Sequence, residues 1–221
     1  MAMGQFAFAN NSNRFLACAP LADQPFAVAG VPYDGVVTNR PGARFGPQAI
    51  RAASLMLCDG IHPFFDVSPL DHLGDALDMR LPNASPLPEV RRHIEAQAAA
   101  LMARHHCAFI GGDHSITLSL LRAAQAQYGN GEPLAVVHFD AHCDTWPDHF
   151  GEPSGHGTWT YEALRDGLAS PAHTVQIGIR SSGERAAREY VADQGGLIFN
   201  ARLLRGKDGE GLAPMVAAIR E

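Results

Sequence analysis

The sequence has few cysteines, and they are not arranged as metal ligands or as a disulfide framework. Of 221 residues only four are cysteine, Cys18, Cys58, Cys107 and Cys143, and no two form a Cys-x-x-Cys pair. Zinc fingers and disulfide-rich secreted domains need close, regular cysteine spacings. We therefore exclude both classes and expect free, mostly buried thiols in a reducing compartment.

Long apolar runs and an excess of basic residues are missing too. Residues 1–20 hold one basic residue, Arg14, and no continuous apolar core, unlike a signal peptide. No run approaches the roughly 20 apolar residues that a membrane helix needs. With 17 Lys and Arg against 23 Asp and Glu, the formal net charge is −6, and no basic stripe is present to bind phosphates. These absences predict a cytoplasmic protein with neither a membrane nor a nucleic-acid partner.

Short apolar runs alternate with helical patterns along the chain. The predicted strands cover 26–31, 107–110, 134–139, 174–179 and 196–199, with a possible short strand at 64–67. The predicted helices cover 47–56, 88–102, 115–128, 159–168, 184–193 and 212–221. Uninterrupted apolar strands between helices favour an α/β fold, with a parallel sheet covered on both faces. We expect an irregular N-terminal arm over 1–24 and one α/β domain over 25–221, with a turn-rich stretch at 66–81.

Polar side chains follow two of these strands. Asp140, His142 and Asp144 come after the 134–139 strand at alternate positions, so they would point to one side while the backbone stays extended. His114 follows the 107–110 strand across a Gly-Gly turn. Because ligands bind at the carboxyl ends of parallel strands, we expect these four side chains to converge. Carboxylates mixed with imidazoles fit Mn²⁺, Fe²⁺ or Zn²⁺ better than Ca²⁺ or Mg²⁺, and the absence of thiolates argues against structural zinc.

Asp113 and His156 have two interpretations each, whereas Cys143 and the other histidines have one. Cys143 should point away from the ligands and pack as a small buried thiol. Asp113 either orients a ligand as a hydrogen-bond acceptor or caps a helix. His156, between two glycines, is a candidate to pass a proton to a leaving amine or is simply an exposed loop residue. The other histidines considered are interpreted as surface or loop residues: His62, His72, His93, His105, His106 and His173.

Three motifs carry a resemblance to a known family. Gly-Gly-Asp-His-Ser at 111–115, Phe-Asp-Ala-His-Cys-Asp at 139–144 and Ser-Gly-His-Gly-Thr at 154–158 resemble the ureohydrolase family of arginases and agmatinases. Segments 30–34, 40–51 and 175–180 resemble the agmatinase branch in particular. The resemblance extends over 25–221 and implies a three-layer, arginase-like α/β fold with a mostly parallel sheet, in a homo-oligomer.

The resemblance also implies a chemistry. His114, Asp140 and Asp144 would hold one Mn²⁺, and His142 with a bridging Asp140 would hold a second. A hydroxide between the ions would attack the guanidinium carbon of an agmatine-like substrate, releasing urea and an amine, as in polyamine biosynthesis. His156 matches the loop histidine that assists proton transfer in the family.

The sequence departs from the family in one respect. Family members carry a further strand ending in Asp-x-Asp, which supplies more metal ligands, and no such motif occurs after Asp144. Two divalent ions bring a charge of +4, whereas Asp140 and Asp144 supply −2. The missing strands would be central ones, so their absence should split the sheet and leave open edges. We therefore expect a truncated or incomplete chain that binds one Mn²⁺ weakly and releases little or no urea.

Two other functions remain open from the sequence. A catalytically incompetent homologue would act as a metal-binding or interaction module. A metallophosphoesterase also uses Asp-x-His and Gly-Asp elements, but there Asp-x-His normally comes first, and the Gly-Asn-His element is absent here. If the chain is a ureohydrolase, the far end of its substrate would meet the loop 146–154. There Asp148 and Glu152 are either partners for a cationic amine or plain solvated acids.

Overall fold

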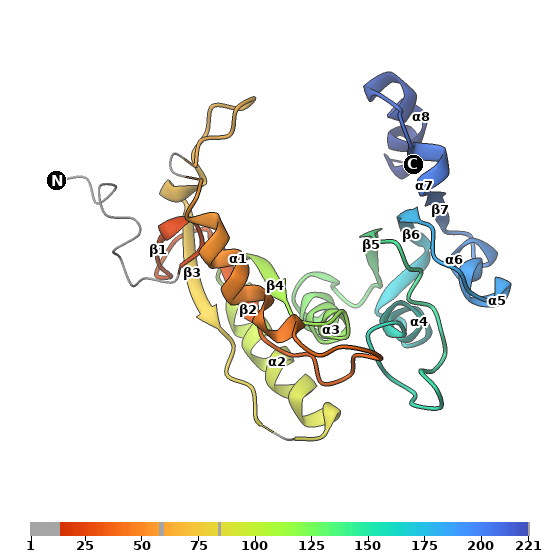
Figure 1. Ribbon diagram of the computed structural model, residues 1–221, viewed down its shortest axis with the longest axis horizontal. Helices are drawn as coiled ribbons and strands as arrows, with labels where there is room; N and C mark the ends of the chain where they lie inside the picture. Colours follow the sequence, from red (N-terminus) through yellow and green to blue (C-terminus); the bar gives the residue numbers. More distant parts are fainter. Residues whose placement is uncertain (1–13, 58–59, 84, 221) are drawn as a thin grey trace. The chain divides into compact units, whose positions relative to one another are not determined.

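The named strands of this protein all pair in parallel, and they form two sheets. The first sheet has the order β1-β3-β2-β4 and the second the order β5-β6-β7. This computed structural model describes residues 14–57, 60–83 and 85–220. They divide into a first unit that ends at Gln127 and a second that begins at Tyr128 (Figure 1).

The first unit holds the four-stranded sheet. Its strands are β1 (Ala19–Pro20), β2 (Phe26–Val31), β3 (Leu73–Asp78) and β4 (His106–Gly111). Its helices are α1 (Gly46–Ser54), α2 (Leu87–Met102) and α3 (Ile116–Tyr128), with short 3-10 turns η2 (Phe15–Ala17), η3 (Ala43–Phe45) and η4 (Pro69–Asp71).

Strand β2 is buried on both faces of this sheet. On one face Val31 joins a core made of α2 and α3 side chains, including Val90, Ile94 and Ile116. On the other face Val28 packs with Cys18 and Leu73. Helix α1 lies against this second face, where a Cβ at Gly30 would meet Pro47 at 2.9 Å. The prediction of a parallel sheet covered on both faces is confirmed for this strand.

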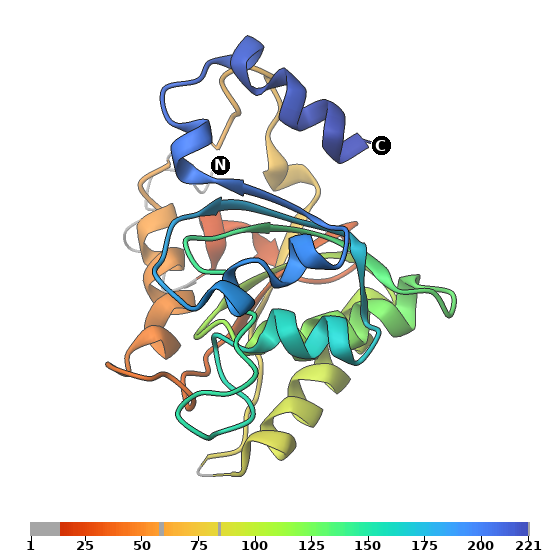
Figure 2. The same ribbon diagram turned by 90° about the vertical axis from the view of Figure 1, so that its right-hand side faces the viewer.

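The second unit holds the three-stranded sheet. Its strands are β5 (Leu134–Phe139), β6 (Ala169–Ile179) and β7 (Leu197–Asn200). Its helices are α4 (Trp159–Arg165), α5 (Arg185–Arg188), α6 (Tyr190–Asp193), α7 (Ala201–Leu204) and α8 (Gly209–Arg220). Figure 2 shows the three strands side by side with α4 next to them. The interior is formed by Ala163, Val175, Ile177 and Val191, all buried.

Both sheets end on an open strand. Among the described residues β4 pairs only with β2, and β5 pairs only with β6. The exposed fractions of Val137 and Phe139 on β5 are 50% and 73%, high for apolar residues in a parallel strand. The prediction of a divided sheet with open edges is confirmed.

Most predicted elements are present, with five differences. Residues 64–67 form no strand, whereas the stretch predicted to be turn-rich contains β3. The helix predicted over 184–193 is two short helices that meet at Glu189, whose φ is −105°. Helix α7 was not predicted. The arm predicted to be irregular contains η2 and β1, and residues 1–13 of that arm lie outside the described part.

Candidate metal centre

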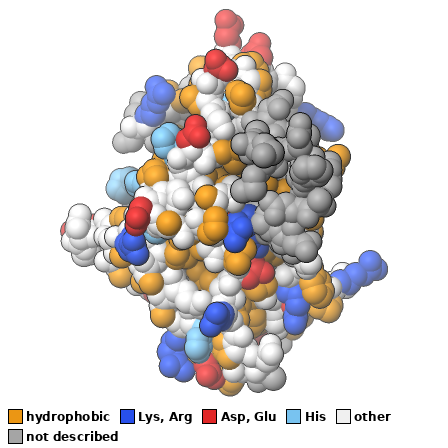
Figure 3. Space-filling view, turned by 90° about the vertical axis from the view of Figure 1, so that its left-hand side faces the viewer, with side chains coloured by type: hydrophobic (Ala, Val, Ile, Leu, Met, Phe, Trp, Pro, Cys, Tyr) orange, Lys and Arg blue, Asp and Glu red, His pale blue; other side chains and the backbone are white. Residues whose placement is uncertain are grey.

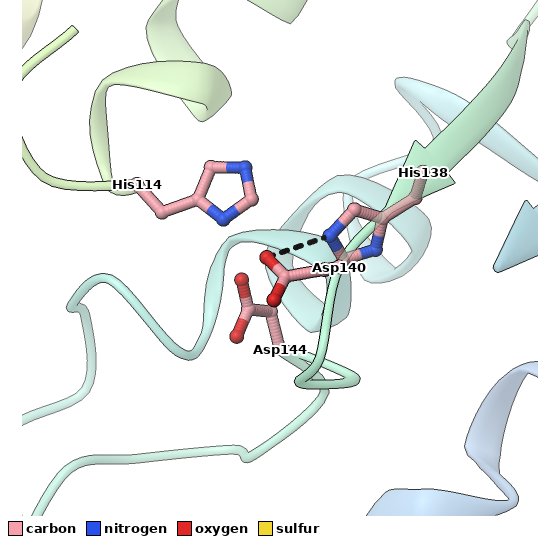
Figure 4. Close-up of side chains that lie close together, drawn as sticks. All are labelled: His114, His138, Asp140 and Asp144. Atoms are coloured by element: carbon pink, nitrogen blue, oxygen red, sulfur yellow. Dashed lines mark hydrogen bonds and ion pairs between the residues drawn. The ribbon is translucent and has the colours of Figure 1, made fainter. Parts of the chain in front are cut away.

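Three potential ligands cluster at the carboxyl end of β5. His138 lies on the strand, Asp140 follows it directly, and Asp144 lies beyond a short bend. Each offers a ligand atom within 4.8 Å of those of the other two (Figure 4). The side chains of His138 and Asp140 are 3% and 18% exposed, and Asp144 is 4% exposed. Two largely buried carboxylates are thus held close to one imidazole.

The backbone over residues 140–144 is not extended, as the alternation argument assumed. A bend covers residues 141–142, and Asp144 adopts a positive φ of 51°. The His142 side chain is 60% exposed, although its Nδ1 lies 3.4 Å from Asp140 Oδ1. Its backbone N–H donates to the same oxygen at 2.9 Å. The bend, rather than strand alternation, therefore brings Asp140 and Asp144 together and leaves His142 toward solvent.

Two side chains that the sequence did not suggest contact these carboxylates. His138 Nε2 lies 3.3 Å from Asp140 Oδ2, and Trp159 Nε1–H donates to Asp144 Oδ2 at 2.7 Å. The sequence did hold a signal for His138, because it precedes Asp140 by two positions, the spacing that places side chains on one side of an extended chain. Nothing in the sequence marked Trp159 beyond its place after the Ser-Gly-His-Gly-Thr motif.

His114 lies in the first unit, half-buried at the turn between β4 and α3 (Figure 4). The preceding Gly112 cannot carry a side chain, because a Cβ there would lie 1.8 Å from the Tyr33 carbonyl oxygen. Asp113 Oδ1 accepts the Ser115 N–H at 2.9 Å, and Oδ2 accepts the Val36 N–H at 3.3 Å. Both donor amides lie outside α3, which begins at Ile116, so Asp113 fixes the turn that leads into the helix and does not cap its first turn through these bonds.

His156 lies in a loop with an ordered internal structure. Residues 149–152 form a two-residue hairpin, in which Phe150 and Gly151 have φ of 52° and 89°. The ring of His149 lies against that of His156, with centroids 4.6 Å apart. Gly157 N–H donates to His149 Nε2 at 3.1 Å. Burial, and then repulsion from His156, lower the pKa of His149 below its ordinary value of 6.5. In its neutral form His149 can accept the Gly157 N–H at Nε2, which a protonated ring could not do.

Buried Glu162 on α4 holds both ends of the motif that contains His156. The Thr158 hydroxyl donates to Glu162 Oε1 at 2.7 Å, and the Ser154 hydroxyl donates to Oε2 at 2.5 Å. Thr158 Oγ1 also accepts the Gly155 N–H at 2.8 Å. These bonds fix where His156 sits along the loop.

The remaining candidates have plain structural positions. Cys143 is fully buried, as predicted, and Cys58 lies outside the described residues. Cys18, Cys107 and Cys143 are free thiols. Asp148 and Glu152 are exposed, and Asp148 Oδ1 accepts the Gly151 N–H at 3.0 Å, which closes the hairpin.

One cavity of the protein lies away from this cluster. A cavity of about 1040 Å³ lies in the first unit, lined by apolar residues such as Phe26, Leu57, Phe65 and Leu73 and by no carboxylate among the described residues. Figure 3 shows apolar and charged side chains interspersed over one face of the protein. No helix in the described part of the chain is long and apolar enough to cross a membrane.

The donor set fits a divalent cation. Asp140 and Asp144 are like charges held close together and away from water, which is unfavourable unless a cation or a proton lies near them. Carboxylate oxygens with imidazole nitrogens are ligands for Mn²⁺, Fe²⁺ and Zn²⁺. The cluster therefore has the composition of a hydrolytic metal centre, not that of a structural zinc site.

Comparison with known proteins gives the family. The model of the arginase family matches residues 24–221, nearly the whole chain. This chain belongs to the arginase family. The resemblance drawn from the three motifs is confirmed, as is the arginase-like α/β fold.

Individual relatives agree with this assignment. An agmatinase from Chromobacterium violaceum is 44% identical over 163 residues, which cover 70% of this chain and 48% of the relative. The structure of proclavaminate amidinohydrolase from Streptomyces clavuligerus has a TM-score of 0.82 and 32% identity, covering 93% of this chain and 69% of that one. A formiminoglutamase variant from Trypanosoma cruzi, solved with Mn²⁺, has a TM-score of 0.75 and 26% identity, covering 90% and 66%. The chain spans about half the length of the curated relatives it matches.

Proposed function

We propose that this protein takes part in the metal-dependent hydrolysis of a guanidino compound, which yields urea and an amine. The observation that carries the proposal is the close pair of carboxylates at the carboxyl end of β5, half-buried Asp140 and buried Asp144. The loop with His156 belongs to the same unit and is fixed by Glu162. The agmatinase and amidinohydrolase relatives support this reaction class.

We assign the ligands as the motifs suggest. Asp140, Asp144 and His114 would hold the one ion expected for this chain, and His142 with Asp140 would hold the second ion of a complete family site. His142 would have to turn inward from its exposed position, and it already contacts Asp140 through its backbone N–H. Mn²⁺ is the proposed metal, because the donor set suits it and a formiminoglutamase of this fold was solved with Mn²⁺.

The residues of this chain would each have a defined task. A bound divalent ion supplies a nucleophilic water near neutral pH and stabilises charge at the reacting carbon. Asp140 and Asp144 hold the ion and offset part of its charge. His156 passes a proton to the leaving amine, while His149 supports the loop by accepting the Gly157 N–H.

The reacting guanidino group defines the class of substrate. The other end of the molecule distinguishes one substrate of this class from another. Agmatine and guanidinobutyrate share the guanidino group and differ at that end. Asp148 and Glu152 are exposed acids of the loop, available to face a cationic amine. We propose agmatine as the first substrate to test, acting in the cytoplasm, in a protein that forms a homo-oligomer.

The test is urea release from agmatine and guanidinobutyrate by the Mn²⁺-loaded chain. We expect any activity to vanish in Asp140→Asn and to fall about 100-fold or more in His156→Asn. His173→Asn, at an exposed position on β6, is the control and should match the parent. If the parent binds Mn²⁺ but releases no urea from either compound, this chain is a metal-binding module and not a hydrolase.

A further inference from the structure

Trp159 connects the first turn of α4 to the metal centre. Its indole is 2% exposed, and its Nε1–H donates to Asp144 Oδ2 at 2.7 Å. An indole has this single donor and no acceptor, so the bond can be made in one orientation only. The start of α4 also binds the Asp144 main chain, because Thr160 N–H and Tyr161 N–H donate to its carbonyl at 3.0 and 3.2 Å. Asp144 is therefore held at both its backbone and its carboxylate.

The same indole packs against His138. The two rings meet edge to face, with centroids 4.8 Å apart and an interplanar angle of 72°. His138 in turn faces Asp140 through Nε2, at 3.3 Å from Oδ2. One aromatic pair thus contacts both carboxylates of the cluster.

Gln176 fixes the tautomer of His138. Its amide nitrogen lies 2.6 Å from the Cys143 carbonyl oxygen and 3.1 Å from His138 Nδ1. Because a carbonyl can only accept, the NH₂ group must face these two atoms. His138 Nδ1 must then accept as well, which places the ring proton on Nε2, toward Asp140. Gln176 is completely buried on β6, so this arrangement is shielded from water.

We propose that Trp159 and His138, braced by Gln176, are positioning residues that orient Asp144 and Asp140 toward the metal, and that His138 is not itself a ligand. Its Nδ1 accepts from Gln176 and its Nε2 carries a proton directed at Asp140, so neither nitrogen presents a lone pair to an ion. The part of this proposal that concerns a metal ion rests on the proposed function. The hydrogen bonds of Trp159, His138 and Gln176 are present whether or not that function is correct.

The backbone explains why such bracing is useful. Asp140 lies one residue past the last residue of β5, and Asp144 has a positive φ of 51°, so neither carboxylate sits on a regular element. Ligands on irregular backbone keep their geometry only if outer hydrogen bonds restrain them.

The first test needs no metal. The chain has two tryptophans, so in Trp146→Phe the Trp159 indole gives the only indole N–H signal in a ¹H–¹⁵N spectrum. We expect hydrogen exchange of this N–H to be at least about tenfold faster after adding Asp144→Ala, because its buried acceptor is lost. A well-resolved spectrum of the double variant shows that it is folded. Unchanged exchange in that folded variant would overturn the proposal.

The second test measures metal binding. By titration calorimetry we expect Trp159→Phe, which keeps a ring but loses the donor, to bind Mn²⁺ about 10–100-fold more weakly than the parent. Gln176→Leu should weaken binding in the same direction, whereas Trp146→Phe should not. With Zn²⁺, which is diamagnetic, the ¹⁵N signals of His138 should keep the pattern of a protonated Nε2. A metal-coordinated pattern at either His138 nitrogen would overturn the proposal.

The two tests separate the possible failures. If the parent binds neither Mn²⁺ nor Zn²⁺, the proposed function fails. The exchange experiment then still decides whether Trp159 restrains Asp144.

Discussion

Arg51 and Asp75 form a buried ion pair between α1 and β3. Arg51 donates to both carboxylate oxygens of Asp75, Nε at 2.8 Å and an Nη at 2.9 Å, and the two side chains are 4% and 0% exposed. Burial alone would raise the pKa of Asp75. The hydrogen bonds from Arg51 and from the Phe15 and Leu77 amides outweigh burial and hold the pKa below 3.8. The pair therefore contributes stability at neutral pH, which is lost as pH falls through the lowered pKa.

Removing the Arg51 guanidinium should destabilise the folded protein. We expect Arg51→Met to lower the free energy of unfolding by about 3–5 kcal/mol, because it leaves the Asp75 carboxylate buried without its partner. Urea unfolding followed by far-UV circular dichroism measures this loss. The matched control is Arg104→Met, which removes an exposed pair with Asp23 at 3.0 Å, and should change little. If Arg51→Met lowers the free energy of unfolding no more than Arg104→Met does, the buried pair is not stabilising.

His149 should make stability depend on pH. Its folded pKa is lowered by burial and by His156, so the unfolded chain binds a proton first as pH falls. The contribution of neutral His149 to the free energy of unfolding is fully present above about pH 6.5. It is lost as pH falls toward the lowered pKa of the folded protein. Thermal unfolding between about pH 8 and pH 5 should thus show a shallower decline in His149→Phe than in the parent. His173→Phe, at an exposed site, should keep the parent's slope, and an identical slope in all three proteins would contradict the assignment.

At the scale of single residues, spacing and motifs suggested candidate ligands and a candidate proton-transfer histidine, but not the side chains that contact them. Asp140, Asp144 and His114 remain proposed ligands, and His156 remains a proposed proton donor. His142 was expected to converge with them and is instead 60% exposed, because the chain bends after β5 and alternation no longer applies. Gln176 and Trp159 come from distant segments, and only the folded chain shows that Trp159 contacts Asp144 and that Gln176 contacts His138.

At the scale of elements, the apolar periods predicted most strands and helices well. One strand that they missed is β3, whose sequence Leu-Gly-Asp-Ala-Leu-Asp contains little apolar signal. It is a strand because Gly74 fits against Leu21 and Asp75 has a buried arginine partner, both tertiary causes. Local sequence cannot reveal such contacts.

The open edge of β5 should promote association. Val137 is 50% exposed on β5, which pairs on one side only within the described part of the chain, and such edges accept strands from other chains. We expect Val137→Lys to reduce the fraction of oligomer and aggregate at equal concentration, measured by size-exclusion chromatography with light scattering. Val216→Lys on α8, where Val216 is 40% exposed, adds the same charge away from an edge and should leave association unchanged. Equal effects of the two lysines would indicate a general charge effect instead.

At the scale of the whole molecule, the division into two parallel sheets is the main architectural fact. The sequence analysis expected a divided sheet, and among the described residues β4 and β5 each pair on one side only. Charge also limits the metal centre. Asp140 and Asp144 supply −2 against the +4 of two ions, so we expect this chain to hold one ion rather than two.

The most direct test of the account is a Mn²⁺ titration of the chain, followed by the electron paramagnetic resonance signal of free Mn²⁺. We expect about one ion per chain, with binding at least about tenfold weaker in Asp140→Asn. Asp148→Asn removes an exposed loop carboxylate of the same unit and should bind like the parent. Binding that is equally tight in Asp140→Asn, or no binding by the parent, would contradict the assignment of this cluster as the metal centre.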